Sequence, residues 1–137
     1  MRYPLLLLLI LLSSFSFAQE AEPPYHIKSI YFGGGNYYID ALQRQEVKAF
    51  LESIPGLEGY DISVHSHTDN IGSKEYNAWL SKMRSEAAIM EIMKLQIDRE
   101  TISIEDFGEL NPVYDNSTLE GRLRNRRVDI ILKRPIM

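Results

Sequence analysis

Two residues in the middle of the chain, Asp69 and Arg84, have the side chains best suited to hold a small charged ligand. The stretch between them leaves a polar strand end, passes through a glycine turn and enters a long amphipathic helix. One carboxylate and one guanidinium, fixed by the fold, match a ligand with one positive and one negative group. We therefore hypothesise that Asp69 and Arg84 hold a small zwitterion.

Each of the two residues also has a structural explanation. Asp69 precedes a turn at 70–72, so its carboxylate suits an Asx turn that accepts backbone N–H groups. Arg84 suits a helix residue whose stem covers apolar surface while its guanidinium reaches water. Spacing alone does not bring the two side chains together, so the ligand role and the structural role both stay open here.

A metal centre is the sharpest alternative. His65, His67 and Asp69 alternate along a predicted strand and would share one of its faces. Two imidazoles and a carboxylate can bind zinc, and the HxHxD run is similar to that of zinc hydrolases. However, the chain has three histidines and no cysteine, and the third histidine, His26, is on another strand. We keep a metal-dependent hydrolase as the alternative and predict no metal, no cofactor and no catalytic residues.

Nucleic acid is an unfavourable partner for this chain. Arg122, Arg124, Arg126 and Arg127 form a dense basic cluster, but no aromatic residues are interleaved with them. The formal net charge is −4 at pH 7, which opposes binding to a phosphate backbone. Ion pairing and support of the last strand are the simpler roles for these arginines.

The N-terminal residues predict a secretion signal. Arg2 precedes an apolar run at 5–12, and Ser16 and Ala18 are small residues of the kind read by signal peptidase. The run is far shorter than the ~20 residues of a membrane-spanning helix. We predict a signal peptide at 1–18, cleavage after Ala18, and a polar linker at 19–24.

The remaining chain has the composition of one ordinary globular domain, which we place at 25–134. Hydrophobic residues make up 45% and charged residues 25%, and the lack of cysteine excludes disulfides and a lipidated cysteine. Apolar patterns predict strands and helices in alternation. The expected strands are 25–32, 60–65, 101–107 and 128–133, and the expected helices are 40–54 and 73–95. A long loop, or a loop with one short helical turn, is expected at 109–121. This order predicts an α/β fold, a two-layer sandwich in which two main helices cover one face of a four-stranded mixed sheet.

The helix at 73–95 carries two stripes. The apolar stripe, at three- and four-residue steps, predicts the buried face, and its members are Tyr76, Trp79, Leu80, Met83, Ala87 and Met90. Asn77, Ser81 and Arg84 form a second stripe beside it, because positions seven apart differ by only about 20° around a helix. We therefore expect Arg84 to border the core.

Three separated motifs resemble the peptidoglycan-binding core of OmpA-like C-terminal domains. They are HTDNIGSKEYNAWLSKMRSEAA, which contains Asp69 and Arg84, then FGELNPV at 107–113 and GRLRNRRVDI at 121–130. The resemblance covers residues 27–132 with the motifs in the family's order. The chain departs from the pattern at Ser66, where the family has glycine, and at Gly33-Gly34-Gly35, where many members carry polar side chains that reach the pocket.

The resemblance implies a non-enzymatic domain that binds bacterial peptidoglycan through the diaminopimelate residue of its stem peptide. Asp69 would accept the ammonium group of that residue, and Arg84 would hold its carboxylate through a bidentate fork. Further pocket positions of the family match Thr68, Asn77, Leu80 and Arg126, with Asn125 a weaker match.

The same resemblance implies a cell-envelope protein that is secreted across the inner membrane into the periplasm. Association with the outer membrane, or with its proteins, stays open. A degenerate domain that kept the fold as a protein-interaction scaffold is a further alternative. Under the leading hypothesis, alanine at position 69 or 84 removes wall binding and leaves the fold intact.

Overall fold

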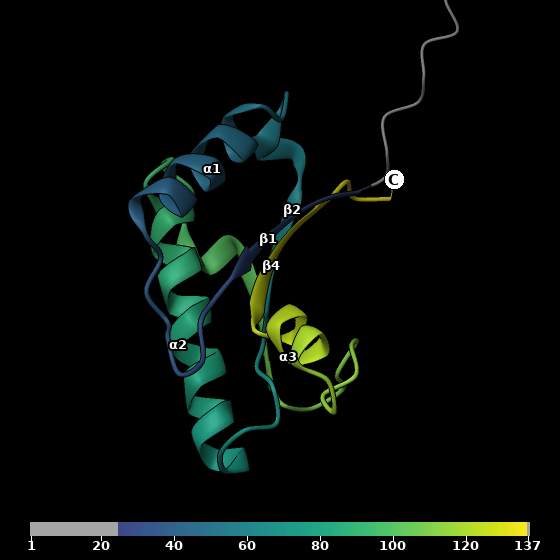
Figure 1. The fold of residues 1–137 in the computed structure, drawn as a ribbon. Coiled ribbons are helices and arrows are strands. Elements are labelled where there is room, and N and C mark those ends of the chain that lie inside the picture. The colour runs from purple at the N-terminus through teal and green to yellow at the C-terminus, as the bar shows by residue number, and fades with distance from the viewer. Residues whose placement is uncertain (1–24, 137) are drawn as a thin grey trace, which may run out of the picture.

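The computed structural model describes residues 25–136 and shows two layers, a sheet and the helices that cover it (Figure 1). The predicted signal peptide and linker lie outside the described residues. In chain order, the elements are β1 (Tyr25–Tyr31), α1 (Ala41–Glu52), β2 (Asp61–His67), α2 (Lys74–Met93), β3 (Ile102–Gly108), α3 (Leu119–Asn125) and β4 (Arg127–Lys133). Short 3-10 turns precede β2 at Leu57–Gly59 and β3 at Arg99–Thr101. The predicted α/β sandwich is confirmed, with the ends of its strands and main helices within two residues of those expected.

The sheet is mixed, as predicted, and its strands lie in the order β1-β4-β2-β3. The last strand, β4, is antiparallel to both of its neighbours, β1 and β2. The pair β2–β3 is parallel, and α2 makes the crossover between them. The C-terminal strand β4 therefore lies between β1 and β2, which brings the arginines before it next to the end of β1.

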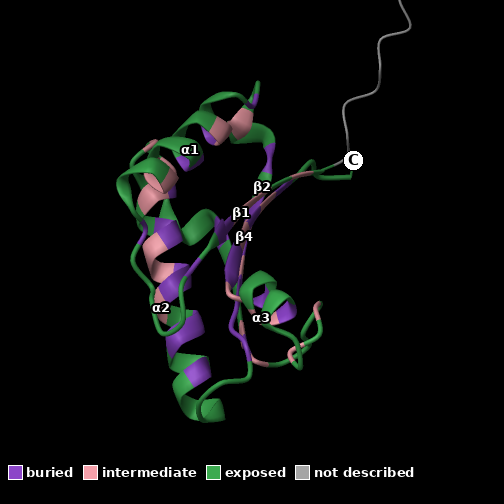
Figure 2. Cartoon of the chain, viewed as in Figure 1, coloured by how far each residue is buried: buried purple, intermediate pink, exposed green. Residues whose placement is uncertain are grey.

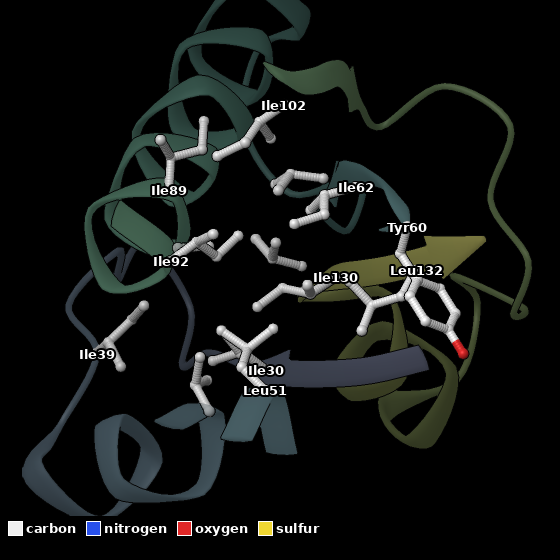
Figure 3. Close-up of a cluster of buried hydrophobic side chains, with 14 of the residues drawn as sticks. Ile30, Ile39, Leu51, Tyr60, Ile62, Ile89, Ile92, Ile102, Ile130 and Leu132 are labelled. Carbon is white, nitrogen blue, oxygen red and sulfur yellow. The ribbon is translucent and has the colours of Figure 1, made fainter. Parts of the chain in front are cut away.

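The core lies between the sheet and one side of α1 and α2 (Figure 3). Both helices begin at side-chain caps. The carboxylate of Asp40 accepts from the backbone N–H of Gln43, and the hydroxyl of Ser73 accepts from that of Tyr76. The fully buried aliphatic residues come from all the layers and include Val47, Val64, Ile89, Ile92, Val128, Ile130 and Leu132.

The predicted buried stripe of α2 is wrong in most of its members. Tyr76, Trp79 and Met90 are 42%, 46% and 63% exposed, and of the predicted stripe only Leu80 is buried. One side of α2 is buried (Figure 2), and over the first half of the helix that side is mostly polar or small. Its buried residues are Asn77, Leu80, Ser81, Arg84, Ser85, Ala88, Ile89 and Ile92.

Close contact between α2 and the sheet explains why the polar side of this helix is buried and its aromatic residues are exposed. Ser66 on β2 and Ser81 on α2 are both fully buried, and the hydroxyl of Ser66 donates to the carbonyl of Ser81 at 2.6 Å. The backbone of Gly108 approaches Ala78 so closely that a Cβ at position 108 would lie 3.2 Å from its nitrogen. Large apolar side chains do not fit such a seam, so they lie on the outer side of the helix. Ser66, which departs from the family pattern, forms part of this seam.

Residues 109–118 form the expected loop, and the short helix α3 begins at Leu119, within the last three residues of the range predicted as loop. Thr118 caps it by accepting from the N–H of Gly121, and its end is fixed by Asn125, whose amide donates to the carbonyl of Tyr114. The two leucines of α3, Leu119 and Leu123, are 62% and 47% exposed, so it has no buried apolar stripe. The N-cap at Thr118 and the hydrogen bonds of Asn125 stabilise this helix. Because neither depends on an apolar stripe, apolar periodicity could not predict it.

We predict that Gly121→Ala destabilises the protein and that Gly59→Ala does not. A methyl group at position 121 would overlap the backbone carbonyl oxygen of Asp115, whereas a Cβ at position 59 meets no atom within 4 Å. Overpacking of this kind costs roughly 1–3 kcal/mol of unfolding free energy. Urea denaturation of both variants measures the difference, and equal midpoints would contradict the close approach at position 121.

Candidate functional site

The six residues expected at a ligand site line one cavity of about 230 Å³. It lies where the loop after β1, the loop after β2 and the start of α2 come together; the first of these runs along α2 in Figure 1. The expected members of the lining are Thr68, Asp69, Asn77, Leu80, Arg84 and Arg126. Five residues that the sequence analysis did not assign complete it: Gly34, Gly35, Ile71, Gly72 and Tyr76.

Arg84 is fully buried, and its guanidinium connects α2 to the loop after β1 and to the end of β2. Its Nε donates to the carbonyl of Asn36 at 2.8 Å, and its two terminal nitrogens donate to the carbonyls of His67 and Gly33 at 3.0 Å. Its guanidinium carbon lies 4.9 Å from the centre of the Phe32 ring, within the range of a cation–π contact. The snorkelling explanation is therefore wrong, since these bonds hold the guanidinium in the interior beside the cavity and it does not extend into bulk solvent.

The guanidinium keeps its charge in this setting. Burial lowers the pKa of Arg84 from 12.5 to about 10, the carboxylate of Asp69 opposes that change, and the Arg126 guanidinium adds to it. A pKa near 10 leaves the group protonated at neutral pH. A guanidinium has five N–H donors, so the three carbonyl bonds leave one donor on each terminal nitrogen for a ligand.

Asp69 forms the predicted Asx turn and also lines the cavity. One carboxylate oxygen accepts from the backbone N–H of Ile71 at 3.0 Å, which is the predicted Asx turn. The other accepts from Nε of Arg126 at 2.6 Å, in an ion pair whose two side chains are 8% and 13% exposed. A carboxylate has about four acceptor sites. Asp69 can therefore accept an ammonium group without giving up either bond.

Asn77 has a buried oxygen atom without a partner. Its amide nitrogen donates to the carboxylate of Glu109 at 2.7 Å, but no group in the described part of the chain donates to its Oδ1. An unsatisfied buried acceptor costs ~1–3 kcal/mol. A ligand with N–H donors would satisfy this atom, since Asn77 lines the cavity.

Glu109 is a site-adjacent residue that sequence reasoning missed. It lies within the FGELNPV motif, yet nothing in the spacing of that motif relates it to a helix residue some thirty positions earlier. Only the parallel pairing of β2 with β3 brings the loop after β3 beside the start of α2. Glu109 adds a second carboxylate near the cavity and holds the Asn77 amide in one orientation.

The glycine loop forms a wall of the cavity from backbone alone. A Cβ at Gly34 would lie 3.5 Å from the Arg126 guanidinium, and one at Gly35 would lie 3.2 Å from the Tyr76 hydroxyl, at a φ of +67° that disfavours side chains. Asn36 does not replace the missing polar contacts, because its side-chain oxygen accepts from the backbone N–H of Tyr38. The loop contributes instead to the binding of Arg84.

The weaker candidate, Asn125, lies outside the cavity. Its amide binds the backbone of Tyr114 and the side chain of Asn116, so it fixes the end of α3. This end carries Arg126, which makes Asn125 a support for the site.

The three residues of the metal alternative do not converge. The register of β2 against β3 shifts between Ser66 and His67, and the His67 ring stacks on Phe107 at a centroid distance of 4.9 Å. Asp69 lies beyond the strand and bonds to Ile71 and Arg126. Within residues 25–136, no three His, Cys, Asp or Glu side chains gather in a way that could hold a metal ion.

A larger groove of about 740 Å³ lies between α1 and the end of α2. Four of its charged lining residues form ion pairs, Lys48 with Glu52 and Lys94 with Glu91, and Arg44 donates to the carbonyl of Ile39. It offers a ligand no buried polar group such as Arg84 or Asn77, so the smaller cavity is the better candidate site.

Sequence comparisons connect this arrangement to known proteins. The OmpA family model matches residues 31–126. Outer membrane protein A of Bordetella avium is 38% identical over 96 residues, which is 70% of this chain and 45% of that protein. Peptidoglycan-binding protein ArfA of Mycobacterium tuberculosis is 32% identical over 71 residues, or 52% of this chain and 22% of that protein. The chain thus spans less than half the length of either relative.

Solved structures share the fold at lower identity. The peptidoglycan-associated lipoprotein from Burkholderia pseudomallei matches with a TM-score of 0.69 and 22% identity, over 77% of this chain and 90% of that one. The cell wall anchor of the T6SS from Pseudomonas aeruginosa matches with a TM-score of 0.67 and 23% identity, over 81% and 82% of the two chains. Both similarities are evidence for the fold alone.

We predict that Arg84→Ala destabilises the protein, which corrects the expectation that this change leaves the fold intact. The substitution leaves three backbone carbonyls without their donor, and each unsatisfied buried carbonyl costs ~1–3 kcal/mol before water enters. We expect a loss of at least about 3 kcal/mol by urea denaturation. Arg99→Ala is the control, because that exposed arginine makes a surface ion pair with Glu86, a type of pair that contributes little to stability. Equal stability of the two variants would show that the carbonyl bonds of Arg84 contribute little.

We also predict that His67 makes the protein less stable in mild acid. Burial, followed by the nearby charge of Arg127, lowers the pKa of His67 from 6.5 to about 4. Between these values the unfolded chain binds a proton that the folded chain does not, so stability is lost as the pH falls from 6.5 towards 4. The loss from this group is at most about 3 kcal/mol. Urea denaturation at pH 7.5 and 4.5 should show a smaller difference in His67→Gln than in the wild type. The same change at His65 is the control, and an equal reduction there would rule out position 67 as the source.

Proposed function

This chain belongs to the OmpA family, and on that premise we propose that it binds bacterial peptidoglycan without covalent chemistry. One named relative supports this class of ligand, because it is called a peptidoglycan-binding protein. Neither it nor the outer membrane protein A of Bordetella avium is named as an enzyme. The cavity is the proposed binding site, and the diaminopimelate residue of the stem peptide is the proposed point of contact.

The observation that carries the proposal is the presence of both charges and an unsatisfied acceptor in one small cavity. In this proposal the ammonium of diaminopimelate donates to Asp69 and to the free oxygen of Asn77. Its carboxylate accepts from the terminal nitrogens of Arg84, with Arg126 close by to add charge. About 230 Å³ suits the end of an amino acid better than a whole peptide or sugar chain.

The same arrangement accounts for selectivity. A ligand without the ammonium would leave Asp69 with an unfilled acceptor position, and one without the carboxylate would leave buried positive charge unmatched. Binding at one stem can be weak and still hold the protein at the wall, because the wall presents many identical stems close together.

We place this function in the cell envelope, in the periplasm of the source cell. The predicted signal peptide agrees with that location, as does the naming of relatives as outer-membrane proteins. Among residues 25–136, none of the helices has the length and apolar character needed to cross a bilayer. Outer-membrane proteins stay candidates as further partners.

The test is co-sedimentation with purified peptidoglycan. We predict that the wild type pellets, that free diaminopimelate reverses pelleting, and that Asp69→Asn weakens it at least about tenfold, since losing one charge of a buried pair costs more than 1.4 kcal/mol. Asp69→Asn keeps the shape of the side chain and its Asx turn. Asp61→Asn, at the exposed start of β2, is the matched control and should pellet as the wild type does.

A second competitor makes the result sharper. Cadaverine (1,5-diaminopentane) has both ammonium groups of diaminopimelate at the same spacing but neither carboxylate. It should compete poorly if Arg84 holds a carboxylate of the ligand. Pelleting of Asp69→Asn at wild-type strength would refute the site, and a folded wild type that does not pellet would favour the interaction scaffold.

A further inference from the structure

Three aromatic side chains form an exposed surface at the edge of the cavity. The rings of Tyr37 and Trp79 meet edge to face, and those of Tyr76 and Trp79 are tilted at 34°, with centroids 5.7 Å apart in both pairs. Tyr37, Tyr76 and Trp79 are 41%, 42% and 46% exposed. We call these three residues the aromatic platform.

The platform is continuous with the proposed ligand site. Tyr76 belongs to the platform and also lines the cavity. Trp79 follows it one helical turn later on α2, and Tyr37 reaches it from the loop after β1. A ligand that fills the cavity and extends out of it past Tyr76 therefore meets Trp79 and then Tyr37.

The fold holds the platform in a fixed arrangement. Arg84 binds the carbonyls of Gly33 and Asn36, so the loop that carries Tyr37 is tied to α2 immediately before that residue. The N–H of Tyr76 is bound by the Ser73 cap at the start of the helix. Rings that are ordered before binding lose little conformational entropy when a partner stacks on them.

Exposure of this set needs an explanation. The spacing of Tyr76 and Trp79 is that of a buried helical face, but the polar seam between α2 and the sheet leaves both rings on the outside. Grouped aromatic side chains on a surface mark a binding site more often than scattered single ones do.

We propose that the platform stacks on a sugar ring of the glycan strand whose stem peptide occupies the cavity. This inference rests on the proposed function and extends it to a second part of the same ligand. A pyranose ring presents a face of C–H groups that packs on aromatic rings, and its hydroxyls point outward, where water and the phenol groups of tyrosine can bind them.

The dimensions agree with this assignment. Two residues of the stem peptide and the side chain of diaminopimelate separate the charged end in the cavity from the lactyl group of the sugar. Two extended residues alone reach up to ~7 Å, which already exceeds the centroid step of 5.7 Å from Tyr76 to Trp79. The connection is therefore long enough for the sugar to reach the platform.

The test compares two ligands that differ only in the sugar: the free tripeptide that ends in diaminopimelate, with its N-terminal amine acetylated, and the same tripeptide attached through that amine to its muramyl sugar. Calorimetry should show that the wild type binds the sugar-bearing form about threefold to tenfold more tightly, the range of one stacked aromatic contact. Trp79→Ala should remove that difference and leave the affinity for the free tripeptide unchanged, because Trp79 does not line the cavity. Trp79→Phe should retain part of it.

Leu42→Ala is the matched control, since Leu42 is a 64% exposed apolar residue on α1 outside the platform and the cavity lining. It should bind both ligands as the wild type does. Trp79 is the single tryptophan of the chain and so reports directly on the platform. Its fluorescence should change more with the sugar-bearing ligand than with the free tripeptide.

Each other outcome has a distinct meaning. Equal binding of both ligands by the wild type would overturn the sugar contact and leave the proposed function standing. Binding of neither ligand would remove the proposed function and this inference with it. A dimer that sedimentation detects in the wild type and not in Trp79→Ala would assign the platform to a second copy of the chain, and the sugar contact would be wrong.

Discussion

A fully buried guanidinium is the constraint on which the rest of this structure depends. A charged group in the interior is costly unless it has hydrogen-bond partners. For Arg84, three backbone carbonyls from two separate segments are those partners. The loop after β1 must therefore lie against α2, and β2 must end where it does. The cavity is the space that remains beside this group, so the residue proposed to bind the ligand also builds the site.

The helix can approach the sheet this closely because the seam between them is small and polar. Ser66 and Ser81 satisfy each other's backbone and hydroxyl groups, and the N–H of Gly108 donates to the Ser81 hydroxyl at 3.0 Å. With no bulky side chains in the seam, the start of α2 is held beside the ends of β2 and β3. The same geometry leaves Tyr76 and Trp79 on the outer side of the helix. The close packing of α2 on the sheet therefore produces both the cavity and the aromatic surface next to it.

Each charged side chain at the cavity has hydrogen-bond partners before any ligand arrives. Asp69 pairs with Arg126, and Glu109 holds the amide of Asn77, while Arg84 is saturated mainly by neutral carbonyls. The protein thus keeps both signs of charge in a small volume without leaving either one bare. What it lacks is a donor to one amide oxygen and an acceptor for the remaining guanidinium N–H groups, and a zwitterion supplies both.

The sequence by itself determined the order of the four strands and the two main helices, and it identified six of the residues that line the cavity, because local periodicity and a long motif resemblance are properties of the linear chain. Three features depended on tertiary structure. The polar side of α2 is the buried one, because Ser66 and Ser81 form hydrogen bonds where the helix lies close to the sheet. A hydrophobicity pattern predicts such serines to be exposed. The helix α3 formed without an apolar stripe, because a cap and the Asn125 amide hold it. Glu109 reached Asn77 because strands distant in sequence pair side by side, and no local pattern in a sequence contains that information.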